Sequence, residues 1–459
     1  MFKRIQSFFT TFKTDQRGSM LFFVLVFGSL SFTFIVLGVA SYGVIENRAA
    51  YHKENREMAF QIAEAGVNYY RWHLAHDKTD YQDGTGLPGP YVHSYADKNG
   101  TVIGHFSLDI TPPASGSTVV TITSTGWLDA QPNSRRTIRV RVGFPSLTDY
   151  ALLTNTDAWI GDSEVTHGKF HANGGIRFDG VGDAQITSAV PTYVCRSYHG
   201  CNNLTKPGVW GVGGPTSLWD FPKPAQDFSA VTAKLSEIKS GAQAAGIYLS
   251  SSGKQGWRLE FVNNGTVKAY KVNATNCYSG LDVNGTQYQF YCIDVKTLAN
   301  PTTYTLPENG LIYVDDTVWV DGVVRGRATV GVATGKSIII NGNVTYYAKD
   351  GAHVLGLIAE QNVLVPRDSP SVLEVNAAML AQNGGTKRYY YSNNVKTALT
   401  IYGSVISAGI WTWSWVNTNN TVISGYQTTN STYDVNLTYN PPPGFPVGSE
   451  YNLISWEEI

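Results

Sequence analysis

The sequence predicts a mainly β protein that begins with one long α-helix, continues into a small antiparallel sheet and ends in a parallel β-helix or β-solenoid. Three observations carry this prediction. An apolar run at 20–43 leads into a helical stripe of small and apolar residues. Apolar and polar residues alternate over much of 104–144, which is the period of a strand. From about residue 150, short strand-like segments are separated by Gly, Asn and Asp, and charged residues make up only 15% of the chain.

The run at 20–43 carries no charged residue and is long enough to span a hydrocarbon core of about 30 Å. Basic residues outnumber acidic ones in the leader 1–18, so the positive-inside rule keeps this leader in the cytoplasm. We therefore expect a single-pass helix at 19–43 that contacts the cell membrane through 20–43, with the body outside. A secretory signal peptide with Gly38-Val39-Ala40 as its cleavage site is the competing interpretation, but its apolar stretch would exceed the usual length of about 7–15 residues.

The basic leader ends in Arg17-Gly18, and the apolar run follows without a polar spacer. This junction resembles the prepilin peptidase site of type IV pilins and of type II secretion pseudopilins. The resemblance implies cleavage between Gly18 and Ser19, methylation of the new N-terminus and retention of the helix as an anchor. Most pilins carry Glu at the fifth mature position, where this chain has Phe23. An intramembrane carboxylate is costly without a partner, so its absence favours a minor or tip subunit, like the large pseudopilin that also lacks it.

Beyond the membrane segment, small and apolar residues recur three and four positions apart, which predicts a helix from about residue 20 to 75. Its small members Ala59, Ala63 and Gly66 would let a sheet approach closely. The stretch Ala-Phe-Gln-Ile-Ala-Glu-Ala-Gly at 59–66 resembles the corresponding region of PilX-like minor pilins.

Gly, Pro and Asn at 76–100 predict loops, and alternation predicts strands near 104–110, 118–128 and 135–144. A long helix on a short antiparallel meander is the pilin architecture, so we expect a pilin-like α+β domain at 44–145. The third strand carries four arginines that are expected to form a solvated face: Arg135, Arg136, Arg139 and Arg141.

Short strands with frequent turns predict a β-solenoid at 150–459, with a β-sandwich as the alternative. A helical insertion is expected near 227–246, followed by a hairpin region around 257–292. The whole region resembles the β-helical C-terminal part of large PilX-like surface proteins, including the proline-rich tail at 439–446.

The four cysteines form two close pairs that lack the spacing of a zinc site, Cys195 with Cys201 and Cys277 with Cys292. In an oxidising compartment we expect two local disulfides, and four buried thiols are the alternative.

Carboxylates that could serve a β-helix lyase or hydrolase mostly lie beside Gly or at strand ends, where Asp is a turn residue by default. They are Asp157, Asp162, Glu164, Asp179, Asp183, Asp315, Asp316 and Asp321. His167 and His171 are expected on one face of a single strand, with no third ligand at matching spacing. The sequence has no serine-hydrolase, phosphate-loop or zinc-protease motif, so we expect no catalytic residue, metal or cofactor.

Trp411, Trp413 and Trp415 alternate, and three tyrosines lie upstream at 389–391. One strand face is therefore expected to carry three indoles that contact a sugar or a partner protein. The alternative is that these rings cover the open end of the solenoid.

The chain has 34 Lys and Arg against 35 Asp and Glu, which leaves no electrostatic footprint for nucleic acid. We expect a non-enzymatic, type IV pilin-like surface protein that presents its solenoid for adhesion, assembly or envelope structure. Its expected partners are pilin or pseudopilin subunits, prepilin peptidase and surface glycans. A static signal-anchored surface protein and a membrane-tethered, carbohydrate-active β-helix enzyme are the alternatives.

Overall fold

The computed structural model describes residues 16–114, 116–229, 234–283, 285–448 and 450–459. The predicted fold class is confirmed, because one long helix and a small antiparallel sheet precede a large, mostly parallel β structure. The chain forms two compact units. Unit 1 comprises Met1–Thr111, Ile122–Val140 and Ser455–Ile459, and unit 2 comprises Pro112–Thr121 and Arg141–Ile454.

Helix α1 of unit 1 spans Gln16–His76, close to the predicted range, and residues 1–15 of the predicted leader lie outside the described residues. Every large apolar side chain between Met20 and Ile45 is exposed. By length and composition alone, this part of α1 is suited to cross a membrane. The C-terminal half of the helix buries one stripe that is at most 3% exposed and consists of Ala59, Ile62, Ala63, Val67, Tyr70 and Leu74. The helix thus divides into an unpartnered apolar half and an amphipathic half.

Five strands form the small sheet of unit 1 in the order β1-β2-β3-β4-β32. Their bounds are β1 Tyr91–Ala96, β2 Val102–Thr111, β3 Val119–Leu128, β4 Gln131–Gly143 and β32 Asn452–Glu458. Strands β2, β3 and β4 were predicted, whereas β1 lies in a segment predicted as loop and β32 was not predicted at all. Strand β32 lies beside β4, where Arg136 pairs with Glu458 and the Arg139 guanidinium lies 3.4 Å from Glu457. Two of the four arginines expected on a solvated face therefore serve this contact.

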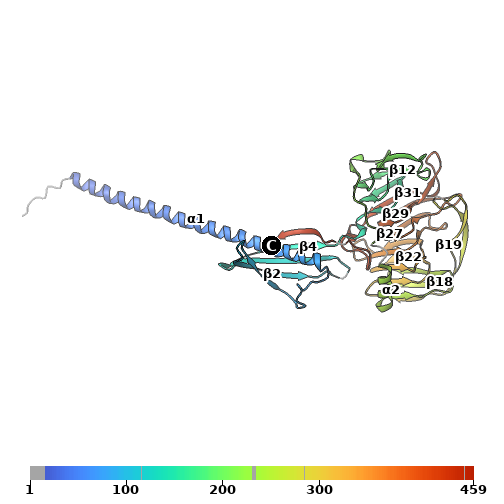
Figure 1. Cartoon of the computed structure of the whole chain (residues 1–459), viewed down its shortest axis with the longest axis horizontal. Coiled ribbons are helices and arrows are strands. Elements are labelled where there is room, and N and C mark those ends of the chain that lie inside the picture. Colours follow the sequence, from blue (N-terminus) through green and yellow to red (C-terminus); the bar gives the residue numbers. More distant parts are fainter. Residues whose placement is uncertain (1–15, 115, 230–233, 284, 449) are drawn as a thin grey trace, which may run out of the picture. The chain divides into compact units, whose positions relative to one another are not determined.

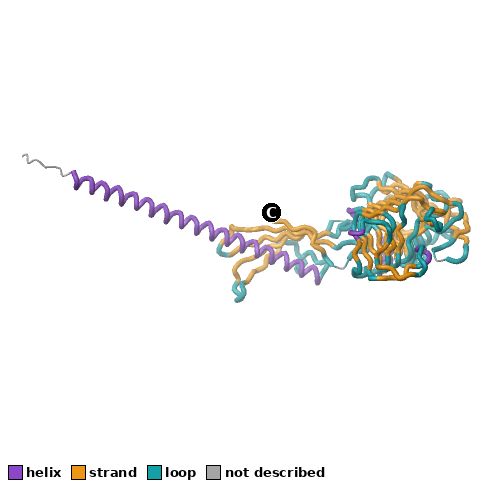
Figure 2. Tube along the Cα trace, turned by 90° about the horizontal axis from the view of Figure 1, so that it is seen from above, coloured by secondary structure: helices purple, strands orange, loops and turns teal. Residues whose placement is uncertain are grey.

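Figure 2 shows the C-terminal part of α1 lying along the small sheet of unit 1. The two approach closely because glycine or alanine stands at the points of contact. A Cβ on Gly126 of β3 would lie 2.3 Å from the carbonyl oxygen of Ala59 and 2.4 Å from the amide nitrogen of Ala63. A Cβ on Gly66 would lie 2.3 Å from the Ser124 hydroxyl oxygen. The close approach expected from the small residues of α1 is confirmed.

Unit 2 is a solenoid in which most neighbouring strands are parallel (Figure 1). Its first strands are β5 Leu152–Thr154, β6 Ala158–Ile160, β7 Glu164–His167, β8 Phe170–Ala172, β9 Ile176–Phe178, β10 Val181–Gly182, β11 Ile186–Ser188, β12 Thr192–Cys195, β13 Leu204–Pro207, β14 Val209–Trp210 and β15 Trp219–Asp220. The next are β16 Ile247–Leu249, β17 Gly256–Val262, β18 Thr266–Gly280, β19 Gln289–Leu298, β20 Thr302–Thr305, β21 Leu311–Val314, β22 Val318–Val324, β23 Arg327–Val332 and β24 Ile338–Tyr346. The last are β25 Val354–Ala359, β26 Val363–Leu364, β27 Val372–Ala381, β28 Thr386–Lys387, β29 Asn394–Ser407, β30 Ser414–Val416 and β31 Val422–Tyr433.

The spatial order of the strands differs from their order along the chain. One face of the stack runs β16, β21, β23, β25, β27, β29, β5, β8, β11 and β15, with every neighbour parallel. The chain therefore enters the stack in its middle, at β5, and runs to one end of the stack at β15. It then crosses to the opposite end at β16 and returns strand by strand to β29, which lies beside β5. At the junction, Leu152 of β5 stands opposite Val405 of β29.

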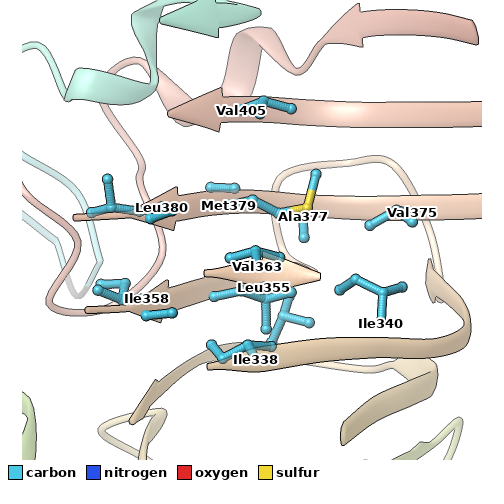
Figure 3. Packing of buried hydrophobic residues seen from close by; sticks show 14 of the residues in the cluster. Ile338, Ile340, Leu355, Ile358, Val363, Val375, Ala377, Met379, Leu380 and Val405 are labelled. Atoms are coloured by element: carbon cyan, nitrogen blue, oxygen red, sulfur yellow. The ribbon is translucent and has the colours of Figure 1, made fainter. Parts of the chain in front are cut away.

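The core of unit 2 is filled by residues that recur at the same position in successive turns, as Figure 3 shows for β24 to β29. Ile338, Leu355 and Leu380 have no exposed surface. Each fully buried Ile or Leu contributes roughly 1.5–3 kcal/mol to the free energy of unfolding. The same buried positions in successive turns hold the short strands against one another.

Helix α2, Lys234–Ala245, lies in the predicted insertion 227–246 and packs Leu235, Ile238 and Ala242 against the solenoid. Residues 230–233 of that prediction lie outside the described residues. Short 3-10 helices occur at Leu147–Asp149, Ser197–His199, Thr216–Leu218 and Val435–Leu437. Strands β17 to β20 form an antiparallel extension in the region expected to hold a hairpin.

The segments by which the chain enters and leaves unit 2 are hydrogen-bonded to each other, and we call them the neck: residues 116–121, 141–150 and 434–448. The Thr118 amide donates to the Tyr439 carbonyl at 2.9 Å, and the Ser146 amide donates to the Thr438 carbonyl at 2.8 Å. The Arg327 guanidinium adds hydrogen bonds to carbonyl oxygens on several segments, namely those of Gly116, Gly351, Asn440 and Pro441. The entry and exit segments are therefore fastened within unit 2.

Candidate functional site

The predicted three-indole face is wrong in its geometry. Trp411 and Trp413 precede β30 and are only 9% and 3% exposed, whereas Trp415 within β30 is partly exposed. Alternation at 411–415 was interpreted as one strand, but the strand begins at Ser414, so the first two rings turn into the core instead. Of the three residues expected to contact a ligand, only Trp415 keeps an accessible ring.

A different group of rings forms the aromatic surface of unit 2, which we define as Tyr288, Tyr390 and Trp415. Tyr288 is 59% exposed. The Tyr390 ring centroid lies 6.2 Å from that of Tyr288 and 5.8 Å from that of Trp415. Rings from the β18–β19 extension and from the 390–415 region thus meet, which could not be read from the spacing within one segment.

Both cysteine pairs form disulfides. Cys195 and Cys201 are buried around the short helix at 197–199, and their Cα atoms lie 5.6 Å apart. Cys277 and Cys292 join β18 to β19 and are exposed. The second disulfide therefore fastens the extension that carries the aromatic surface.

Most of the candidate carboxylates bind neighbouring turns of the solenoid. Asp157 accepts the Gly175 amide at 2.8 Å, and Asp183 accepts the Gly168 amide at 2.9 Å. Asp179 accepts the Trp159 indole N–H and pairs with Arg177.

The second group of carboxylates behaves in the same way. Asp315 pairs with Lys239, Asp316 accepts from Ser252, and Asp321 forms a bidentate pair with Arg258. These contacts hold the structure together, which is the role expected of turn Asp residues. Among the described residues, no three His, Cys, Asp or Glu side chains come together as a metal site would require.

The two histidines do not share a strand face, which corrects the prediction. Gly168, with φ +121°, separates His167 in β7 from His171 in β8. His167 Nδ1 lies 2.7 Å from Asp183 on the surface, whereas His171 is 1% exposed. The tight turn at Gly168 is the reason, because it places the two residues on different sides of the coil.

His171 lines a cavity of about 250 Å³ on the side of the solenoid, which we call the lateral pocket. Its lining comes from Tyr150, from Lys169 and His171 at β8, from Gln185 and Thr187 at β11, and from residues 223–226. Residues 221–227 form a strap that is held to the coil: the Lys223 amide donates to the Ser188 carbonyl at 2.9 Å. Four separate segments of the chain therefore build the pocket.

The charges around the pocket are balanced. The Lys169 ammonium lies 2.8 Å from Asp149, and the Lys223 ammonium lies 2.6 Å from Asp220. Burial opposes the charge on Lys169, but the Asp149 carboxylate outweighs it, and the net effect raises the pKa of Lys169. Burial also raises the pKa of Tyr150, so its phenol is protonated at neutral pH.

A hydrogen-bonded chain orients the pocket wall. The Asn173 amide is fixed, because its Nδ2 donates to the Gln226 carbonyl at 2.8 Å and its Oδ1 accepts the Gln226 amide at 2.8 Å. His171 Nε2 lies 3.1 Å from the same Oδ1 and must therefore carry a hydrogen. Burial lowers the pKa of His171, so the ring is neutral at pH 7 and its Nδ1 accepts from Thr187 at 2.8 Å.

The lateral pocket was not predicted, although the sequence holds a weak signal for it. Lys169 and Gln185 are 16 positions apart, as are His171 and Thr187, which is the local length of one coil. A repeated polar pair at coil spacing marks side chains that stack on one outer face. The strap could not be foreseen, since it comes from a loop after β15.

The Gly18–Ser19 junction lies near the start of α1, whose backbone is helical there. Nothing in the arrangement of the described residues tests cleavage at this bond, so the processing site remains a prediction.

No protein family and no curated protein matches the chain. Among solved structures, the competence-associated pilin ComZ from Thermus thermophilus is similar, with 13% sequence identity, a TM-score of 0.29, and coverage of 88% of this chain and 97% of that chain. A TM-score this low carries no argument about fold or function.

Proposed function

We propose that this chain is a non-enzymatic, membrane-anchored surface protein of the type IV pilin kind, which presents its solenoid outside the cytosol. The carrying observation is the division of α1. Its first half exposes every large apolar side chain between Met20 and Ile45, and its second half packs Ala59 and Ala63 against an antiparallel sheet. A water-exposed surface of this size is strongly unfavourable, so it requires lipid or other helices around it.

The direction of insertion follows from charge. The basic leader would stay in the cytoplasm, and the body would face outward. Two disulfides in unit 2 support this placement, because disulfides persist in oxidising compartments.

Processing by a prepilin peptidase between Gly18 and Ser19, with methylation of Ser19, belongs to the same proposal. Phe23 in place of the usual Glu favours a minor, PilX-like or tip subunit, in the manner of a large pseudopilin. Its partners would be other pilin or pseudopilin subunits, which would bury the exposed half of α1.

Adhesion or envelope structure is the proposed role of unit 2. The engagement of most candidate carboxylates by structural partners supports a non-catalytic function, and the aromatic surface supports contact with a partner. Turnover on a panel of polysaccharides is expected to be absent. Turnover that disappears in Asp162→Asn or Asp179→Asn would contradict the non-enzymatic part of the proposal.

Mass spectrometry of the mature N-terminus tests the proposal directly. The full chain would be produced with a prepilin peptidase and recovered from membranes, and a methylated Ser19 is expected. Gly18→Leu should retain Met1, whereas Gly28→Leu, a matched change whose Cβ meets no atom within 4 Å, should be processed normally. An intact Met1 in the wild-type chain would refute processing, and an N-terminus near Ser41 would indicate a secretory signal peptide.

A further inference from the structure

We propose that the lateral pocket binds one neutral sugar unit of a glycan. The proposal deepens and rests on the proposed function, because only an outward-facing unit 2 meets surface glycans. Four observations carry it: the balanced charge of the lining, its hydrogen-bonding groups, its size and its prior organisation.

The charge balance selects a neutral ligand. Lys169 and Lys223 each lie within 2.8 Å of a carboxylate, so their positive charges are offset and the pocket wall offers a phosphate or an acidic sugar no net attraction. A cation gains no attraction either, because the residues that line the pocket include no carboxylate. A ligand without charge loses the least hydration free energy when it enters the pocket.

The uncharged groups of the lining match a polyol. Gln185 and Gln226 each have a side-chain amide that can donate and accept, as a sugar hydroxyl also does. Tyr150 contributes an apolar ring face for the C–H side of a sugar, with its centroid 6.0 Å from that of His171. Polar groups on several walls around one ring face are a typical lining for a small polar ligand.

The volume limits the ligand to a single ring. Drug-sized ligands occupy pockets of about 300–1,000 Å³, and the lateral pocket measures about 250 Å³. Gln185, Lys223 and Pro224 are exposed, so the pocket opens to the surface and a longer glycan could continue outside it.

The pocket is organised before any ligand arrives. Asn173 holds the strap through both backbone groups of Gln226, and His171 fixes the Asn173 amide from the other side. The Gln185 side chain is exposed at the mouth and is not used in this chain of hydrogen bonds. Little conformational entropy is therefore lost when the strap meets a ligand.

Isothermal titration of the purified full chain, in a detergent without a sugar headgroup, tests the proposal. The probes are glucose, galactose, mannose and N-acetylglucosamine, with glucuronate and inorganic phosphate as charged comparisons. We expect saturable binding of at least one neutral sugar in the millimolar range, about tenfold weaker binding in Gln185→Leu, and unchanged binding in Gln289→Leu, another exposed glutamine on β19.

Three results would overturn the proposal: no saturable binding of any neutral sugar, preference for glucuronate or phosphate, or equal binding by Gln185→Leu and the wild-type chain. Titration does not depend on processing of the N-terminus. A chain with intact Met1 that binds sugar would refute pilin processing alone, and a methylated chain that binds no sugar would refute the pocket alone.

Discussion

Replacing Gly126 with Ala tests the close approach of helix and sheet in unit 1. The φ angle of Gly126 lies outside the left-handed region, so alanine meets no backbone strain there. Its Cβ would lie 2.3 Å from the Ala59 carbonyl oxygen, where ordinary contacts begin at 3.4 Å. Because the obstructing atoms are helix backbone, α1 must retreat by about 1 Å, and the buried stripe loses packing along its length.

The expected cost combines two opposing effects. Overpacking of a close-packed interface costs about 1–3 kcal/mol. Removing glycine from a strand interior returns about 0.5–1 kcal/mol. Because the obstructing atoms are helix backbone, the upper end of the overpacking range applies, and the net loss is about 2 kcal/mol. This loss corresponds to roughly thirtyfold faster hydrogen exchange in β2, β3 and β4 where exchange follows the opening equilibrium.

Hydrogen exchange followed by mass spectrometry measures this effect within unit 1 alone. Gly43→Ala is the control, since Gly43 lies on the same helix and its Cβ would meet no atom within 4 Å. Its exchange pattern in the sheet should match the wild type. Unchanged or slower exchange in Gly126→Ala would refute the inferred contact.

Three further predictions concern unit 2. Arg327→Met removes a guanidinium that donates to the carbonyls of the neck, and the free energy of unfolding of unit 2 should fall by about 3 kcal/mol. Limited proteolysis should then cut the segments 116–121 and 434–448. The control Arg325→Met changes an exposed arginine nearby and should leave this cleavage pattern unchanged. A mild reductant should open the exposed disulfide Cys277–Cys292 before the buried disulfide Cys195–Cys201, and alkylation followed by mass spectrometry measures the order. Earlier alkylation of Cys195 and Cys201 would contradict this prediction. Burial, with a smaller contribution from Arg177, lowers the pKa of His199 to about 4. As the pH falls below about 6.5, this histidine is protonated in the unfolded chain before it is protonated in the folded chain, so up to about 3 kcal/mol of the free energy of unfolding should be lost by pH 4. The melting temperature of unit 2 should therefore depend less on pH in His199→Gln than in the wild type. An equal pH dependence in both proteins would show that His199 is not the group responsible.

The sequence predicts those parts of the fold that depend on neighbouring residues. The extent of α1 follows from an apolar run and a stripe with helical period, and its close contact with the sheet follows from Ala59, Ala63 and Gly66. Short strands between turns suffice to predict a solenoid. The pairing of β5 with β29 could not be predicted, because Leu152 and Val405 carry no local mark of their distant partner.

In the candidate site too, features that depend on residues close in sequence were predicted, and features that depend on distant residues were not. The cysteine pairs are close in sequence and form the disulfides expected from that spacing. Trp411 and Trp413 were misplaced because alternation was extended past the start of β30 at Ser414. The lateral pocket could not be predicted because its lining comes from two coils and a strap. The register of β8 against β11, which brings the residues of the two coils together, is not visible in the sequence.

Strand β32 has a consequence for the order of events during synthesis. The contact between Arg139 and Glu457 joins residues 318 positions apart, and residues 144–451 lie between β4 and β32 in the chain. The ribosome thus makes the solenoid before the strand that covers the edge of β4. Until then this edge is unpaired and able to add a foreign strand, as edge strands do. A chain interrupted anywhere in the solenoid would keep an open edge beside α1, which gives quality-control proteases a simple mark of an unfinished molecule.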